Sequence, residues 1–258
     1  MSTITTEELF RDDATLLQCQ ATVLAADGYG IVLDRSVFYP QGGGQAGDSG
    51  TLETEAGAVL TIADTRKHPS LPGVIVHVHV QVPAPEADAM VFAAFAPGTV
   101  VTARVDGPRR RAHMRFHTAT HLLCALVPYP VDGCSITATY ARLDFHTAEP
   151  LDKEALCAGL LRLVAGAHPV RQRSIGEAEL DANPQLVRSM RVQPPRSADG
   201  QGRIRLIEIE GVDQQPCGGT HVANSAEVGA VTVTKIEKKS AQTRRVVLGF
   251  AEPAAGRG

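Results

Sequence analysis

The chain has 258 residues, enough for one large domain or two ordinary ones, and a formal net charge of −3. This charge excludes a generally basic nucleic-acid coat, so any polyanion must meet local basic patches. The chain has no Trp and only 4% aromatic residues, which disfavours broad platforms for base stacking.

The five cysteines (Cys19, Cys124, Cys134, Cys157 and Cys217) are scattered and odd in number, and residues 1–13 lack the apolar core of a signal peptide. No apolar run approaches the roughly 20 residues that a membrane-spanning helix needs. We therefore expect a reduced, cytoplasmic protein that does not enter a membrane.

Short apolar runs separated by turn residues fill the sequence from Leu16 to about Val105. This pattern is typical of a small β-barrel, which the strand Thr99–Val105 would close. Val74 to Val82 alternates at period two, which predicts a strand with one apolar face. The opposite face carries His77 and His79, and we expect that face to be solvated.

A glycine-rich stretch, Phe38–Gly50, has the most unusual composition in the chain. Gly42, Gly44 and Gly47 satisfy the spacing of the dinucleotide-binding fingerprint, but that motif needs a helix to open at the glycines, and the sequence around Asp48 opposes one. Two interpretations remain. The bare backbone can approach a sugar-phosphate chain closely, or the glycines form a structural turn cluster.

Asp106 and Pro108 suit the cap and first turn of a helix, which we expect over Arg109–Val127. We place a domain boundary here and predict domains over residues 1–105 and 106–258. The start of the helix is basic and forms either a solvated face or a phosphate contact, through Arg109, Arg110, Arg111 and Arg115.

The second half mixes strand and helix patterns, which predicts an α+β domain with helices packed on a mostly antiparallel sheet. A helix is expected over Leu151–Ala167, begun by Asp152, and a Pro/Gly/Ser loop over residues 193–202. The expected strands cover residues 134–145, 170–175, 203–210, 228–236 and 245–250.

Two short stretches have the spacing of metal ligands. His117 and His121 lie one helical turn apart on one face. Cys217 and His221 are separated by two glycines and Thr220, which let the backbone turn so that both side chains can face one centre. Two imidazoles from a helix with a thiol and an imidazole from a turn match the tetrahedral preference of zinc, so we predict Zn²⁺ bound by all four.

Two other interpretations of these residues can be considered, a zinc protease and a site with Cys124 as a ligand. The zinc-protease signature needs Glu after its first His, and Thr118 stands there, so peptide hydrolysis by that route is not supported. Cys124 falls on the same helical stripe as the histidines and is either a rival ligand or a buried inert thiol.

Several stretches together resemble the editing domain of alanyl-tRNA synthetases and their free-standing AlaX relatives. They are Arg110–Leu123 (RRAHMRFHTATHLL), Arg142–Phe145 (RLDF), Ile207–Val222 (IEIEGVDQQPCGGTHV) and Thr243-Arg244-Arg245, preceded by the glycine-rich stretch. The matches span about residues 16–250. The resemblance implies an AlaX protein of the intermediate-length kind, with a glycine-motif β-barrel domain followed by a zinc-containing tRNA editing domain.

The resemblance also implies a reaction, the hydrolysis of mischarged tRNA(Ala), chiefly Ser-tRNA(Ala) and possibly Gly-tRNA(Ala). Its zinc ligands fall on His117, His121, Cys217 and His221. An apolar pocket that accepts alanine rejects serine by only about a hundredfold, so a second, hydrolytic sieve is chemically reasonable. The alternatives are a threonyl-type editing deacylase and a non-catalytic, zinc-stabilised tRNA-binding module.

Hydroxyl groups near the helix are the candidates for reading the serine hydroxyl, and spacing does not choose among them: Thr118, Thr120, Ser135, Thr137 and Thr139. The general base stays unassigned. Four protein ligands describe a closed zinc site, so for catalysis either one ligand leaves the metal or zinc orients the substrate.

Further tRNA-binding candidates are Gly42, Gly43, Gly44, Lys235, Lys238, Lys239, Arg244 and Arg245.

Overall fold

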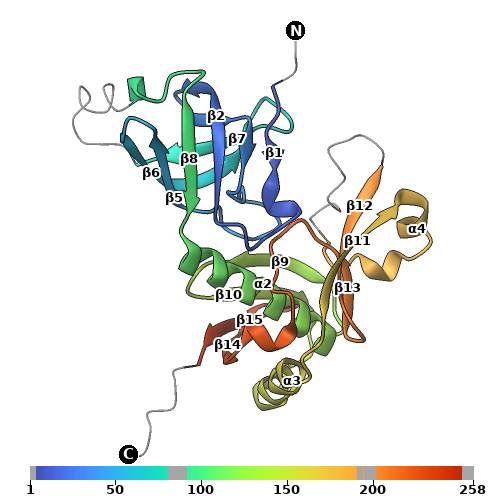
Figure 1. The fold of residues 1–258 in the computed structure, drawn as a ribbon. Coiled ribbons are helices and arrows are strands. Elements are labelled where there is room, and N and C mark those ends of the chain that lie inside the picture. Colours follow the sequence, from blue (N-terminus) through green and yellow to red (C-terminus); the bar gives the residue numbers. More distant parts are fainter. Residues whose placement is uncertain (1–3, 81–91, 191–193, 195–201, 252–258) are drawn as a thin grey trace, which may run out of the picture. The chain divides into compact units, whose positions relative to one another are not determined.

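Figure 1 shows the computed structural model of the chain, which describes residues 4–80, 92–190, 194 and 202–251. The chain divides into two compact units. Unit 1 comprises Met1–Gly42 and Ala46–Arg110, and unit 2 comprises Gly43–Gln45 and Arg111–Gly258. The domain limits 1–105 and 106–258 stay a prediction.

Unit 1 contains a closed antiparallel barrel of six strands in the order β2-β3-β7-β6-β5-β8, which confirms the predicted barrel. The strands are β2 (Gln18–Asp27), β3 (Gly30–Leu33), β5 (Gly50–Thr54), β6 (Val59–Lys67), β7 (Ile75–His79) and β8 (Val100–Val105). Apolar side chains from alternate positions fill its interior, among them Val23, Leu52 and Ile62. The described part of the unit also contains a short 3-10 helix, η1 (Leu9–Arg11), and a parallel pair, β1 (Glu7–Glu8) and β4 (Arg35–Ser36).

The expected solvated histidine face of β7 is wrong for His77. This side chain is fully buried, because the Phe38 ring stands edge-on against the imidazole at 5.1 Å and Ser36 and Ile31 contact its two nitrogens. His77 Nδ1 donates to the Ile31 carbonyl at 2.9 Å, so Nε2 accepts from the Ser36 hydroxyl at 2.7 Å. Burial lowers the pKa of His77 to about 4, so the imidazole is neutral at physiological pH.

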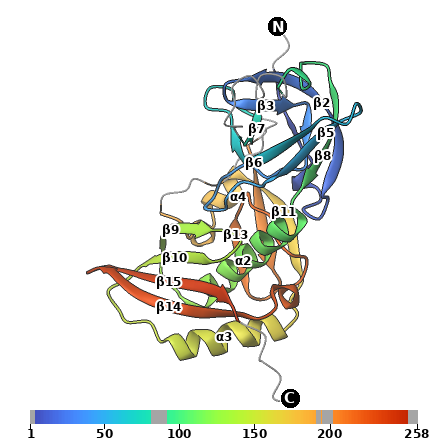
Figure 2. The ribbon, with the colours of Figure 1, turned by 90° about the vertical axis from the view of Figure 1, so that its left-hand side faces the viewer.

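Unit 2 is built on a four-stranded antiparallel sheet in the order β14-β15-β10-β9, whose strands lie side by side in Figure 2. The strands are β9 (Val131–Ile136), β10 (Ala141–His146), β14 (Val231–Ser240) and β15 (Thr243–Phe250). The helix α2 (Gly107–Leu126) meets this sheet where Phe116 stacks on Phe250. The helix α3 (Lys153–Ala165) packs against β14 and begins at Asp152, whose carboxylate caps it as predicted.

A second, three-stranded antiparallel sheet in unit 2 positions the cysteine turn. Its order is β11-β12-β13, with β11 (Val170–Gly176), β12 (Arg203–Ile209) and β13 (Asp213–Pro216). The short helices α4 (Glu177–Asp181) and η2 (Pro184–Leu186) lie between β11 and β12 in the sequence, and η3 (Ser225–Val228) follows β13. Most of the predicted loop 193–202 lies outside the described residues. None of the described helices has both the length and the apolar character needed to cross a bilayer.

Candidate metal centre

The helix α2 supplies two of the clustered side chains. It starts as the sequence indicates, with the Asp106 carboxylate accepting from the Arg109 amide at 3.0 Å. His117 and His121 then lie one turn apart, and both imidazoles are buried. Their alignment is therefore a direct consequence of helical spacing.

The turn after β13 supplies the other two, Cys217 and His221. Arg205 on β12 holds this turn by donating to the carbonyls of Cys217 and Gly219 at 2.7 and 2.9 Å. Gly219 is required because a Cβ there would lie 2.0 Å from the His117 ring. The turn can therefore reach the helix only through a residue without a side chain.

The four predicted ligand atoms lie within 4.8 Å of one another. A tetrahedral zinc, with nitrogen ligands at about 2.0–2.1 Å and sulfur at about 2.3 Å, needs ligand atoms about 3.3–3.7 Å apart. Cys217 Sγ lies 3.3 Å from both His117 Nε2 and His221 Nε2. The donor set and the two distances from Cys217 Sγ therefore fit a zinc ion.

The protonation states of Cys217 and His221 also suit metal binding. Burial raises the pKa of the Cys217 thiol, but the adjacent His117 and His221 outweigh it and hold that pKa well below its usual value. Burial, followed by the charge of His117, lowers the pKa of His221 to about 3. A thiolate and a neutral imidazole are the forms that bind a metal.

Each of the three imidazoles has a protein partner at its other nitrogen. His117 Nδ1 lies 2.7 Å from Gln45 Oε1, and His121 Nδ1 lies 2.8 Å from Asp213 Oδ2. His221 Nδ1 lies 3.2 Å from the Thr118 hydroxyl. Such partners fix the ring orientation and tautomer of metal ligands, so the cluster has a complete outer layer of hydrogen bonds.

Comparison with known proteins places this cluster in a family. The family model "Threonyl and Alanyl tRNA synthetase second additional domain" matches residues 204–247, and "tRNA synthetases class II (A)" matches residues 6–108. The "Alanyl-tRNA editing protein AlaX-M" of Methanosarcina barkeri is 32% identical over 93% of this chain and 97% of its own length. The chain belongs to the AlaX-M family.

Another AlaX-M protein, from Methanosarcina mazei, is 30% identical over 97% of this chain and 99% of its own length. The "Alanine--tRNA ligase" of Ignicoccus hospitalis is 31% identical over 90% of this chain. The chain spans 24% of that ligase. Its length therefore matches the AlaX-M proteins, whereas it corresponds to about a quarter of the ligase.

The predicted hydroxyl candidates have different surroundings in this family member. Thr118 is bonded to His221, and Thr120 donates to the His117 carbonyl at 2.7 Å, so both hydroxyls support the ligands. The strands expected over residues 134–145 are present as β9 and β10, with a turn after Ile136. Thr137 and Thr139 lie in that turn, where the Thr137 hydroxyl accepts from the Thr139 and Tyr140 amides. Among the described hydrogen bonds, the Ser135 hydroxyl takes part in none.

The predicted basic candidates separate into buried and accessible groups. Arg110 is 1% exposed and its guanidinium is ion-paired with Asp48, so the expected phosphate contact is replaced by a structural role in unit 1. Arg115 is half-buried over the Phe250 ring at 3.9 Å. Arg245 is bidentate with Asp144, and Arg244 is bonded to the Ala148 carbonyl. The exposed cations are Arg111, Lys235, Lys238 and Lys239, with Arg109 half-buried.

Cys124 stays outside the cluster. It is buried, and burial raises the pKa of its thiol to about 12, which favours the inert thiol over the rival ligand. All five cysteines are free.

Sequence reasoning missed two residues that contact the ligands, Gln45 and Asp213. Gln45 directly follows the glycine run, and Asp213 stands four residues before Cys217. Asp213 has the same four-residue spacing as the ligand pairs, so spacing does not distinguish an outer partner from a ligand, and Gln45 has no ligand pattern at all. The fold, rather than the distance along the chain, sets an outer partner.

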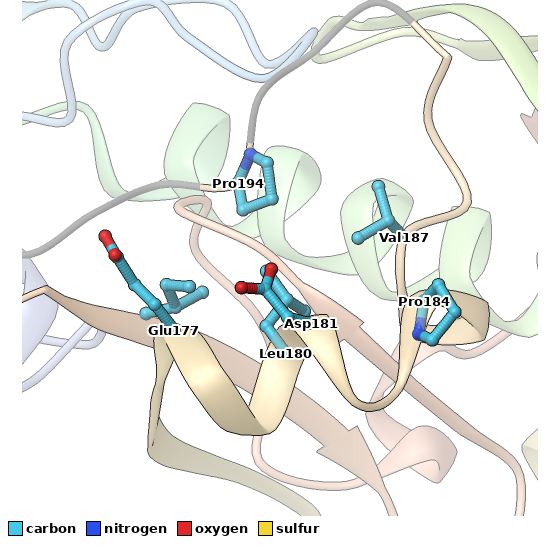
Figure 3. A pocket seen from close by; sticks show the side chains of 7 residues that line it. Glu177, Leu180, Asp181, Pro184, Val187 and Pro194 are labelled. Atoms are coloured by element: carbon cyan, nitrogen blue, oxygen red, sulfur yellow. The ribbon is translucent and has the colours of Figure 1, made fainter.

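A surface cavity of about 370 Å³ also lies in unit 2 (Figure 3). Its lining combines apolar residues with two carboxylates: Leu180, Pro184, Val187, Pro194, Ile204, Glu177 and Asp181. It shares no lining residue with the ligand cluster, and its carboxylates disfavour a polyanion.

Proposed function

We propose that this protein hydrolyses the ester bond of mischarged tRNA(Ala), with Ser-tRNA(Ala) as its chief substrate and Gly-tRNA(Ala) as a second. The single observation that carries this proposal is the buried cluster of His117, His121, Cys217 and His221, in a chain that belongs to the AlaX-M family. The two relatives named from that family are both called alanyl-tRNA editing proteins, which favours the alanyl over the threonyl type of deacylase.

The cluster would hold Zn²⁺ through three imidazole nitrogens and one thiolate. When bound, zinc supplies Lewis-acid chemistry to a substrate ester. The chain's own residues hold the ligands in place, with Gln45, Asp213 and Thr118 at the imidazole Nδ1 atoms. Ser135 is the remaining candidate for reading the serine hydroxyl, because the other candidates use their hydroxyls within the protein.

Serine differs from alanine by one hydroxyl group. In a site that hydrogen-bonds this hydroxyl, the buried polar groups lose their partner when alanine binds instead. This loss can favour the seryl over the alanyl ester by as much as about 10⁴-fold. The proposed specificity therefore predicts that Ala-tRNA(Ala) is spared.

The experiment measures release of the amino acid from Ser-tRNA(Ala), Gly-tRNA(Ala), Ala-tRNA(Ala) and Ser-tRNA(Thr). Rapid release from Ser-tRNA(Ala), with little from Ala-tRNA(Ala), supports the proposal. Preference for Ser-tRNA(Thr) would instead establish the threonyl type. Binding of tRNA without hydrolysis, combined with unfolding on chelation, would establish the non-catalytic module.

The metal role is tested with Cys217→Ala and the matched control Cys157→Ala, a partly buried thiol near the Thr232 hydroxyl. We expect Cys217→Ala to lower bound zinc and deacylation together, whereas Cys157→Ala keeps both. Retention of zinc and activity by Cys217→Ala would refute its role as a ligand.

A further inference from the structure

The glycine-rich stretch delivers one fully buried side chain, Gln45, into unit 2. Gly43 and Gly44 adopt φ values of +57° and +86°, which favour glycine. Gly44 lies against β9, where its carbonyl accepts from the Ile136 amide at 2.7 Å and a Cβ would meet Cys134 at 2.9 Å. Contacts with β9 therefore hold the backbone of this segment, and any side chain at position 44 would clash with Cys134.

The carboxamide of Gln45 joins the helix to the cysteine turn. Its Oε1 lies 3.1 Å from the Thr220 amide nitrogen and 2.7 Å from His117 Nδ1. Its Nε2 donates to the Thr220 hydroxyl at 2.9 Å. Three segments far apart in sequence thus meet at one side chain.

These contacts determine where the proton of His117 lies. The Thr220 backbone amide can only donate, so the atom it approaches must be the oxygen of Gln45. A carboxamide oxygen only accepts, so His117 Nδ1 carries the hydrogen. In the neutral imidazole Nε2 then keeps its lone pair, and this nitrogen lies 3.3 Å from Cys217 Sγ.

We propose that Gln45 is a positioning residue for the metal centre, which selects the His117 tautomer and orients the ring so that Nε2 faces the metal. The glycines before it serve to present this carboxamide. The inference rests on the proposed metal role of the cluster and assigns a positioning task to a stretch that could also have contacted a sugar-phosphate chain.

A residue that merely fills the core would act through its volume alone. Gln45→Met keeps a similar side-chain length but removes the acceptor, whereas Gln45→Glu keeps acceptor oxygens. Thr220→Val removes the hydroxyl group that accepts from Gln45 Nε2. It keeps both contacts of Gln45 Oε1, with the backbone amide of residue 220 and with His117 Nδ1. These three variants therefore separate packing from tautomer selection.

The first measurement is the imidazole ¹⁵N spectrum of the metal-free protein at mildly alkaline pH. We expect His117 to be the Nδ1–H tautomer in the wild type, in Gln45→Glu and in Thr220→Val. Gln45→Met should lose this preference. An unchanged His117 tautomer in a folded Gln45→Met protein would overturn the proposal.

The second measurement is zinc affinity by competition with a chromophoric chelator. Gln45→Met should weaken zinc binding about 10–100-fold, the usual effect of losing an outer partner, while Gln45→Glu stays close to the wild type. Equal losses in both variants would overturn the proposal. If the wild type binds no zinc, the proposed function fails while the tautomer measurement still tests Gln45.

Discussion

The carboxylate of Asp213 accepts a hydrogen bond from His121 Nδ1 at 2.8 Å, with both side chains buried. Gln215 donates to the two oxygens of the same carboxylate at 2.9 and 3.0 Å. Burial alone would lower the pKa of His121, but the hydrogen bonds to Asp213 and then Cys217 raise it to about 10. The carboxylate only accepts, so Nδ1 keeps its hydrogen, and a metal ion at Nε2 would displace the second proton of the imidazole.

Removing this carboxylate should weaken the metal site without removing a ligand. We expect Asp213→Ala to lower zinc affinity about 10–100-fold, because an oriented and more basic imidazole is lost. Chelator competition measures the change. Asp132→Ala is the matched control, since Asp132 faces the half-exposed His146 at 3.5 Å and should leave zinc affinity unchanged. Equal affinity in Asp213→Ala and wild type would contradict the expectation.

Arg110 and Arg111 are neighbours with opposite expected phenotypes. Arg110→Met leaves the buried Asp48 carboxylate without its cation, which should cost about 3–5 kcal/mol of unfolding free energy. Arg111→Met breaks only an exposed pair with Glu227 and should cost about 1 kcal/mol or less. Urea unfolding measures both. A stability loss in Arg110→Met no larger than that in Arg111→Met would rule out the structural role.

His77 should make the stability of unit 1 depend on pH. Its pKa is about 4 in the folded state against an ordinary value of 6.5, so the unfolded chain binds the extra proton between these two values. Stability is then full above 6.5, falls as pH drops towards 4, and loses roughly 3 kcal/mol in total. His77→Gln, which can still donate to Ile31 and accept from Ser36, should flatten this part of the curve. Parallel curves of unfolding free energy against pH would show that His77 is not responsible.

The exposed lysines of β14 should contribute to tRNA affinity by neutralising phosphates. Replacing Lys238 and Lys239 with Gln should weaken tRNA binding and reduce the slope of log K against log salt by about 0.7–0.9 for each phosphate that is no longer neutralised. Titrations at several salt concentrations measure this slope. Lys153→Gln on α3 is the control, since its ammonium group is bonded to the Thr234 carbonyl. A slope that is the same in the double variant as in the wild type would exclude a role for these lysines.

The ligand cluster was predictable because each half of it is local. Helical spacing aligns His117 with His121, and glycines let Cys217 and His221 turn to one side. The outer partners were not predictable in the same way. Gln45 meets His117 across 72 positions, and a hydrogen bond between distant polar side chains leaves no periodic trace in the sequence.

The barrel was also predictable, because short apolar strands and turn residues repeat through the first half of the chain. The buried polar groups within it were not. Period-two alternation placed His77 on a solvated face, but the Phe38 ring and the Ser36 hydroxyl cover its imidazole. Likewise, Arg110 and Arg111 look equivalent in the sequence. Only the fold shows that Arg110 is buried against Asp48 whereas Arg111 is exposed.

The tripeptide Gly43–Gln45 belongs to unit 2, although the residues on either side of it belong to unit 1. A fragment that begins at Arg111 would inherit every proposed zinc ligand and still lack the acceptor for one imidazole. Any transplant of the C-terminal half into another polypeptide would therefore have to bring this tripeptide with it.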